Sequence, residues 1–385
     1  MRGLWRPRGV GFAAMLAALA LGVAACGGND SGSGSASGGG GSGGSSDGKT
    51  FKIVMSNGFV SQWRTEMQNI ATEMAKNNEP YKGHVDFQVV VSETSPTAQI
   101  QSINNIIAQR PDAILINALS PTALDPVVKK ACAQGIVVVY FDQVGQEKCA
   151  YRVRNNETKL FENNAEWLAK TLKGKGNIIQ DLGLPGSPVS QFGTQAAADV
   201  FKKYPGIKIV SKYEGNYTPG PSKQAVTRIL TSTQGIDGVY GIAGVDGAAQ
   251  PFEETKTKMV PMTNYGDMSV RLTNFIQANK KNGLDFSMAE NAPTLGGQAL
   301  HAAWLVLNKQ NVFDKAWGFT QGHDPKEVYI PSRAFATNGL PPIAGFEKTT
   351  YQELVDMSKG LPENALIPLS LEQSPVTNEQ ALGGN

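Results

Sequence analysis

The sequence is poor in the residues that build metal sites and catalytic centres. It has 3 histidines and 3 cysteines among 385 residues. His84, His301 and His323 are scattered, and none has a histidine or cysteine three or four residues away, which argues against a zinc site. No Gly-x-Ser-x-Gly elbow, phosphate loop or dinucleotide glycine fingerprint follows a predicted strand. We therefore expect neither an enzyme nor a bound cofactor or metal.

The sequence also lacks a cluster of basic residues with interleaved aromatics. Of its 35 basic residues, Arg2, Arg6 and Arg8 precede an apolar stretch and are expected to be removed with it. The remaining 32 face 33 acidic residues, a net charge of −1. This balance argues against nucleic acid as a partner.

The first 25 residues are typical of a secretory signal peptide, with three arginines, an apolar stretch from Val10 to Ala25 and small residues before Cys26. The stretch is shorter than the roughly 20 residues that span a bilayer, so a permanent transmembrane helix is the weaker alternative. Residues 23–26, Val-Ala-Ala-Cys, resemble the bacterial lipobox, in which the cysteine becomes the lipid-bearing N-terminus. The other alternative is an ordinary cleavage site beside a chance cysteine.

A run dominated by glycine and serine follows Cys26 and ends at Gly48. It has too little apolar surface to fold and is expected to act as a flexible coil. Its 22 residues, 27–48, have an r.m.s. reach of roughly 25 Å. Residues 26–48 are therefore predicted to be a tether to the outer face of the cell membrane.

The two other cysteines, Cys132 and Cys149, lie 17 residues apart. An exported chain with two remaining cysteines favours a disulfide between them. Two free thiols are the alternative, because spacing alone does not establish bridge geometry.

From Phe51 onward, short apolar runs alternate with amphipathic stretches of helical length, which predicts parallel sheets covered by helices, an α/β fold. In the first half, strands are expected at 51–56, 85–91, 113–117 and 136–141, and helices at 62–77, 96–109 and 121–134. After a break at 151–156, strands are expected at 176–182, 207–213, 238–242, 259–262 and 285–289, and helices at 158–172, 189–203, 221–232, 246–255 and 269–278. The 337 residues from Lys49 onward predict two domains.

Four local motifs, in this order and spacing, resemble a known family. They are Met55-Ser56-Asn57-Gly58-Phe59 before Trp63-Arg64, then residues 109–114, then 136–139 before Phe141-Asp142, and residues 293–300 with the helix after them. Together they resemble the sugar-type, ribose-binding-like branch of the type I periplasmic binding proteins, the substrate-binding proteins of bacterial ABC importers. The resemblance covers residues 49 to about 333.

The resemblance implies two Rossmann-like lobes joined by three crossings, with a ligand between them. It places the first lobe at 49–153 plus 291–333 and the second at 154–290 plus 334–385, with crossings near 153–156, 289–292 and 333–338. The implied function is capture of a sugar or sugar-like compound by a monomer that delivers it to an ABC permease. A lipoprotein that reports to a membrane receptor remains an alternative. A weaker alternative is a carbohydrate-active enzyme in which Asp142 and Glu290 face each other across a cleft as acid and base.

Ligands of parallel sheets lie beyond the carboxyl ends of the strands. Trp63 and Arg64 follow the first strand, where an indole stacks on a sugar ring and a guanidinium donates to hydroxyls. Without the resemblance, a core tryptophan and a solvated arginine would be the simpler interpretation. Asp142 ends the fourth strand at the family's acidic position, and Gln143 replaces the arginine that many relatives carry next to it.

The second lobe offers five further candidate ligand contacts. Gln191 stands where an arginine of relatives reaches the ligand. Asp246 and Glu290 follow or end later strands, at positions where the family places polar contacts. Asn264 and Asp267 follow another strand, where relatives place an acidic ligand contact, and either of the two is a candidate for it. Each of these four has helix capping or another local role as its alternative.

Overall fold

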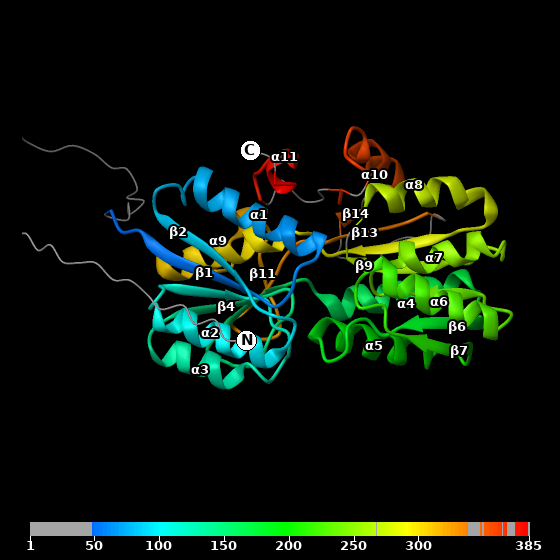
Figure 1. Cartoon of the computed structure of the whole chain (residues 1–385), viewed down its shortest axis with the longest axis horizontal. Helices are drawn as coiled ribbons and strands as arrows, with labels where there is room; N and C mark the ends of the chain where they lie inside the picture. Colours follow the sequence, from blue (N-terminus) through cyan, green and yellow to red (C-terminus); the bar gives the residue numbers. More distant parts are fainter. Residues whose placement is uncertain are drawn as a thin grey trace, which may run out of the picture. The chain divides into compact units, whose positions relative to one another are not determined.

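The computed structural model describes residues 48–266, 268–337, 347–348, 350–363, 365–367 and 374–383. Within these residues the chain forms two seven-stranded sheets, each with helices on both faces (Figure 1). The first sheet with its helices is called the first lobe, and the second sheet with its helices the second lobe. Cys26 and Asp267 lie outside the described residues.

The first lobe is built mainly from residues 51–154 and 295–329. Its strands, in pairing order, are β11 (Thr320–Gln321), β12 (Glu327–Tyr329), β5 (Tyr151–Arg154), β4 (Val137–Phe141), β3 (Ala113–Ile116), β1 (Phe51–Asn57) and β2 (Val85–Val91). Neighbours are parallel except β11 and β12. One face is covered by α1 (Gln62–Asn77) and α9 (Leu295–Leu307), the other by α2 (Pro96–Ala108) and α3 (Asp125–Ala133). A short 3-10 helix, η2 (Lys315–Trp317), follows α9.

The second lobe repeats this plan. Its strands, in pairing order, are β14 (Glu347–Lys348), β13 (Arg333–Ala336), β10 (Phe286–Glu290), β9 (Met262–Gly266), β8 (Gly238–Tyr240), β6 (Lys175–Asp181) and β7 (Gly206–Tyr213). Neighbours are parallel except β10 and β13. The helices are α4 (Glu157–Thr171) and α5 (Pro188–Phe201) on one face, and α6 (Pro219–Ser232), α7 (Val245–Glu254) and α8 (Val270–Asn279) with η1 (Lys280–Asn282) on the other. Both sheets are therefore mixed but mostly parallel, as the α/β pattern predicts.

The apolar strands are buried on both faces. In β1, Ile53 and Met55 pack under α1 and α9, while Val54 between them packs under α2 and α3. Successive side chains of a strand point to opposite faces, so a sheet covered on both sides selects a continuous apolar run. This explains why hydrophobic runs located most strands in the sequence.

Serine caps set the start of several helices. The side chains of Ser61, Ser95, Ser187 and Ser269 accept the backbone N–H three residues ahead, at the starts of α1, α2, α5 and α8. These starts agree with the expected ones to within one residue. The expected start of α3 at Pro121 is wrong, because a turn occupies the residues before Asp125. Pro126, which has no N–H to donate, stands in the first turn of α3.

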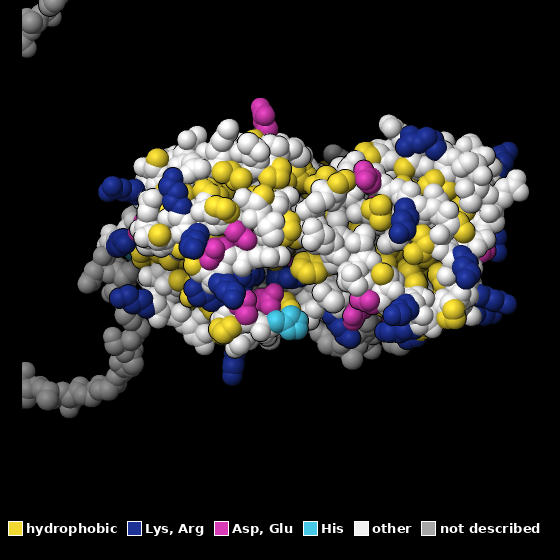
Figure 2. Space-filling model, turned by 90° about the horizontal axis from the view of Figure 1, so that it is seen from below, with side chains coloured by type: hydrophobic (Ala, Val, Ile, Leu, Met, Phe, Trp, Pro, Cys, Tyr) yellow, Lys and Arg dark blue, Asp and Glu magenta, His cyan; other side chains and the backbone are white. Residues whose placement is uncertain are grey.

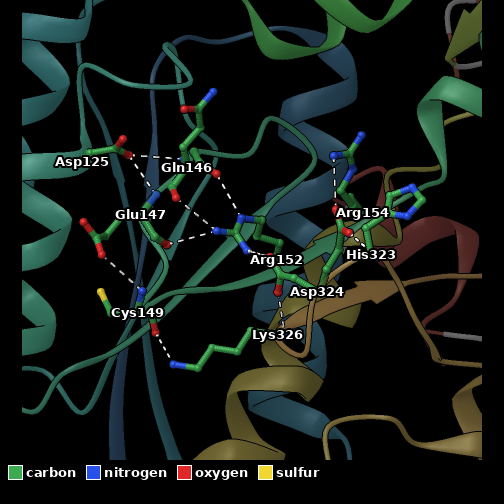
Figure 3. A network of polar contacts seen from close by, with 11 residues as sticks. Asp125, Gln146, Glu147, Cys149, Arg152, Arg154, His323, Asp324 and Lys326 are labelled. Carbon is green, nitrogen blue, oxygen red and sulfur yellow. Dashed lines mark hydrogen bonds and ion pairs between the residues drawn. The ribbon is translucent and has the colours of Figure 1, made fainter.

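Strand β5 was expected to be a break in the chain. Its charged residues Arg152 and Arg154 lie on a buried strand, and two of their acidic partners, Asp324 and Glu327, come more than 170 residues later in the sequence (Figure 3). Arg152 donates to Gly145 O (3.1 Å) and pairs with Asp324 (2.5 Å). Arg154 pairs with Glu157 and Glu327. A strand that carries buried charges is stable only with such partners.

Strand β9 begins later than expected, at Met262 instead of Met259. Pro261 precedes it, and the strand continues through the polar residues Thr263 and Asn264. Both are buried, and the Thr263 hydroxyl accepts from the Gly241 backbone N–H (3.0 Å). The apolar pattern therefore ended before the strand did.

The chain passes between the sheets at three linkers that the resemblance implies. They are residues 155–156 between β5 and α4, 291–294 between β10 and α9, and 330–332 between β12 and β13. The third precedes the expected range of 333–338, because residue 333 already pairs in β13.

The expected domain boundary assigns the whole C-terminal tail, residues 334–385, to the second lobe. In the structure, the end of the tail packs on the first lobe instead. Helix α10 (Tyr351–Ser358) lies beside α8, but α11 (Asn378–Ala381) lies beside α1 of the first lobe (Figure 1). Asn69 Nδ2 of α1 donates to Ala381 O (3.1 Å). The alternation that predicts sheets and helices carries no information on where such a tail packs.

The expected bridge between Cys132 and Cys149 is present in the structure. It joins the end of α3 to the loop that leads into β5.

None of the helices in the described part of the chain combines the length and hydrophobicity needed to span a bilayer.

Candidate functional site

A cavity of about 280 Å³ lies between the carboxyl ends of the two sheets. Its first-lobe lining is Phe59, Ser61, Gln62, Trp63, Arg64, Asp142, Gln143 and Asn291. Its second-lobe lining is Val189, Tyr217, Thr218, Pro219, Ile242, Ala243, Gly244, Val245, Asp246, Asn264, Tyr265, Gly266, Ser269, Arg271 and Leu272, and Leu366 of the tail completes it. Both lobes and the tail therefore build one cavity at the edge where parallel sheets bind ligands.

Trp63 and Arg64 are positioned by the start of α1. The Ser61 side chain accepts from the Arg64 backbone N–H (3.3 Å) and fixes the first helical turn. The Trp63 indole Nε1 donates to Asn291 O (2.6 Å), on the second linker between the lobes. This bond orients the half-buried indole at the cavity wall.

Arg64 is 2% exposed, and its guanidinium is held by amide oxygens. It donates to Asn57 Oδ1 and to Asn117 Oδ1 (3.2 Å) and lies 4.0 Å from the centre of the Phe59 ring. In the amide orientation that satisfies its neighbours, Gln143 also accepts from Arg64 Nη2 (2.5 Å). Burial lowers the pKa of Arg64 to about 10, and the charge of Asp142 opposes this shift. Arg64 therefore remains a cation at neutral pH.

Asp142 leaves β4 with a φ of 55°, a left-handed conformation that Asp tolerates better than most residues. Its two carboxylate oxygens accept from Asn117 Nδ2 (3.0 Å) and Asn291 Nδ2 (2.9 Å). Burial raises the pKa of Asp142, while Arg64 and the two amides lower it. Each oxygen has a second lone pair, so the carboxylate can accept further bonds from a ligand.

The same network extends to all three linkers between the lobes. Asn155, on the first linker, donates to Asn291 Oδ1 (2.6 Å) on the second. Ser332, on the third, donates to Asn155 Oδ1 (2.6 Å). Because Asn291 also holds Asp142, the cavity and the linkers share one chain of hydrogen bonds.

The second-lobe wall contains an ion pair and a half-buried tyrosine. Arg271 Nε, on α8, donates to Asp246 Oδ2 (2.9 Å) at the start of α7. The Asp246 side chain is 7% exposed and that of Arg271 46%, so the guanidinium covers the carboxylate from the solvent side. Tyr217 bonds to Ser190 Oγ (2.6 Å), and burial raises its pKa to about 12, which keeps its hydroxyl protonated. This wall offers donors and acceptors of both kinds.

The structure brings six of the predicted site residues together. Trp63, Arg64, Asp142, Gln143, Asp246 and Asn264 all line the cavity. Asn264 lies at its wall with its backbone oxygen accepting from Asn164 Nδ2 (2.7 Å).

Two predicted residues lie elsewhere. Gln191 is exposed and lines a separate cavity near Arg152 and Arg154. On α5, Val189 faces the site, and a residue two positions later is about 200° away around the helix. Glu290 is buried, and its carboxylate accepts from the Arg333 N–H (2.9 Å) of the neighbouring strand β13.

Several residues of the site were not predicted. Asn57, Asn117 and Asn291 hold the charged pair, and Arg271 holds Asp246. The position of Asn57 and Asn117 at the ends of β1 and β3 was a usable signal. Asparagine at such positions is, however, also the ordinary residue of a turn.

Acidic and basic side chains are interspersed on the face of the molecule shown in Figure 2. Within the described ranges, no group of three or more His, Cys, Asp and Glu residues is arranged to hold a metal ion.

Comparison of the sequence with those of known proteins identifies a family and several relatives. The profile of the Periplasmic binding protein domain family matches residues 53–311. The galactofuranose-binding protein of Escherichia coli is 26% identical over 178 residues, which are 45% of this chain and 54% of the relative. The chain thus spans about half the length of that relative. The xylitol-binding protein of Mycolicibacterium smegmatis is 23% identical over 287 residues, 71% of this chain and 76% of the relative.

Solved structures share the two-lobed fold. An ABC transporter solute binding protein from Thermobispora bispora superposes with a TM-score of 0.64 at 28% identity, over 74% of this chain and 84% of that one. An ABC transporter solute binding protein from Bacillus halodurans with bound myo-inositol gives a TM-score of 0.63 at 19% identity, over 75% and 95% of the two chains.

Proposed function

Because the chain belongs to the Periplasmic binding protein domain family, whose members bind ligands and are not enzymes, we propose that it captures a small polar ligand for an ABC transporter. The ligand is a sugar or sugar-like compound, bound between the lobes outside the cytoplasm and delivered to the permease. The names of the relatives support this class, since they bind galactofuranose and xylitol.

The observation that carries the proposal is the charge balance of the cavity. Arg64 is matched by Asp142, and Asp246 is paired with Arg271. A charged ligand would leave one buried charge without compensation, which is costly. A neutral polyhydroxyl compound avoids this cost, because its hydroxyls donate to the carboxylates and accept from the guanidinium groups. The Trp63 indole supplies the apolar surface on which a ring or carbon chain packs.

Ligand entry requires the lobes to separate at the three linkers. Direct contacts between the lobes include the Gln143 amide, which donates to Ser187 Oγ (3.2 Å), and the Arg154 guanidinium, which lies 4.1 Å from the centre of the Phe192 ring. A ligand that bonds to Asp142 on one lobe and Asp246 on the other would favour the closed form, because those contacts exist only when the lobes meet.

A thermal-shift screen tests this function. We expect at least one neutral compound among D-arabinose, D-allose, xylitol and myo-inositol to raise the melting temperature. At one hundred times its Kd, the ligand should add about 2.7 kcal/mol to the free energy of unfolding. D-glucuronate, a sugar acid, serves as the charged comparison and is expected to bind more weakly. Absence of a shift with every neutral compound at millimolar concentration would contradict the proposal, as would release of a product from any of them.

We further propose that lipid on Cys26 anchors the protein at the outer face of the membrane. The expected result is that Cys26→Ser releases the protein from the membrane fraction of the producing cells, since a lipid chain is the attachment. The ligand-induced thermal shift should be unchanged, because the folded lobes begin after the tether. Cys132→Ser is the matched control and should remain in the membrane fraction. Retention of the Cys26→Ser protein there would contradict the anchor.

A further inference from the structure

The C-terminal tail contributes a wall of the ligand cavity. Leu366 lines the cavity and is only 2% exposed. Its backbone N–H donates to Glu66 Oε1 (3.4 Å) on α1 of the first lobe. At the same time Leu366 forms an antiparallel bridge with Ser269, at the start of α8 in the second lobe. One tail residue therefore touches both lobes and the space between them.

The tail is fixed to the second lobe by the free end of α8. The first N–H groups of a helix have no partner inside the helix. In α8, the Val270 N–H donates to Ala365 O (3.0 Å) and the Arg271 N–H to Glu363 O (2.9 Å). The Ile367 N–H in turn donates to Met268 O (2.6 Å). The tail thus caps the helix that carries Arg271 to the cavity.

Side chains on both sides of Leu366 are part of the hydrophobic cores. Ala365 and Ile367 belong to the core of the second lobe, and Ala381 belongs to that of the first. Ser374 is fully buried and donates to Thr294 O (3.2 Å), next to α9. Such burial specifies one position for the tail, because displacing it would expose apolar surface to water.

We propose that Leu366 is a specificity-determining residue that limits the size of the ligand. This inference rests on the proposed function of the cavity. Leu366 adds an apolar surface on the tail side of a cavity whose other walls combine apolar residues, such as Phe59 and Leu272, with amides and charged groups. Leu366 enters the cavity from a fixed point, because both lobes hold its backbone. It therefore excludes ligands that extend toward the tail and packs against the carbon skeleton of those that fit.

The test compares Leu366→Ala with Ile367→Ala by titration calorimetry. Both changes remove a buried aliphatic side chain from the same segment, but Ile367 packs in the second-lobe core and does not line the cavity. The probes are xylitol, D-allose, myo-inositol and the disaccharide lactose. We expect Leu366→Ala to shift the ratio of affinities toward the larger probe by about tenfold or more, the effect of a few methylene groups in a pocket. Ile367→Ala should leave that ratio unchanged.

Equal changes in the affinities of all probes, or the same change of ratio in both variants, would overturn the proposal. A wild-type protein that binds none of the probes would instead contradict the proposed function. In that case the position of the tail is tested in the absence of ligand, by measuring hydrogen exchange of the wild-type protein. The Val270 and Arg271 amides should be protected, and exchange as fast as that of an uncapped helix end would overturn the tail's role.

Discussion

Replacement of Arg64 by methionine is expected to lower the free energy of unfolding by about 3 to 5 kcal/mol, the cost of breaking a buried pair of charges. The same variant should lose measurable ligand binding. Its Asp142 would remain buried without the cation that opposes its raised pKa, and the oxygens of Asn57 and Asn117 would lose a donor. Chemical denaturation and calorimetry with the ligand found by the screen measure the two effects.

Two further variants separate the charge effect from loss of packing. Arg228→Met removes an exposed arginine of α6 and should change stability by no more than about 0.5 kcal/mol. The double variant Arg64→Met with Asp142→Asn removes both charges. Its loss of stability should therefore be smaller than the sum of the two single losses, and the difference should be about 1 to 3 kcal/mol. Strict additivity would show that Arg64 and Asp142 do not interact.

Arg154→Met is expected to destabilise the first lobe by a similar amount, about 3 to 5 kcal/mol. Arg154 is 7% exposed and pairs with Glu157 and Glu327, whose side chains are also buried. Methionine preserves much of the apolar stem but leaves both carboxylates without their cation. The contact of the guanidinium with Phe192 of the second lobe is lost as well. Urea denaturation at several pH values is the measurement.

The pH dependence identifies Glu157 as the group responsible. Burial raises the pKa of Glu157 from 4.5 to about 7, and Arg154 opposes the shift. A raised folded-state pKa means that its contribution to stability is complete below pH 4.5 and is lost as the pH rises to about 7. Without Arg154 this pKa rises further, so the variant should continue to lose stability above pH 7 while the wild type levels off. Parallel curves above pH 7 would contradict this assignment.

Adding Glu157→Gln to Arg154→Met supplies the control. The double variant has no carboxyl to titrate at this position, so its additional loss above pH 7 should disappear. Persistence of the loss would assign it to another group.

The alternation of strands and helices was predictable because it follows from local sequence. A strand buried on both faces must be apolar throughout, as β3 with Ala113–Ile116 is, and a helix needs a capped first turn, as at Ser61. The expectation that buried strands are apolar failed where buried charges are paired with residues distant in the sequence. Arg152 and Arg154 read as a break because Asp324 and Glu327 lie more than 170 residues away.

The candidate site was predictable only to the level of strand ends. Placement after a strand indicated Trp63, Arg64, Asp142 and Asp246, since carboxyl ends of parallel strands meet at one edge. The direction of a side chain around a helix was not indicated, so Gln191 was misplaced by half a turn. Arg271 was missed because its partner Asp246 lies 25 residues earlier, on another helix.

The sequence by itself therefore indicated the α/β alternation and the strand ends at which polar residues stand, because periodicity and strand-end position are local properties. Its resemblance to the ribose-binding-like family implied the two-lobed plan. The tertiary structure decided which polar groups form one network, how Asn155, Asn291 and Ser332 tie the linkers together, and that Leu366 of the tail closes the cavity. These features depend on contacts between residues far apart in the chain. Burial makes each of them strong only when every partner is in place.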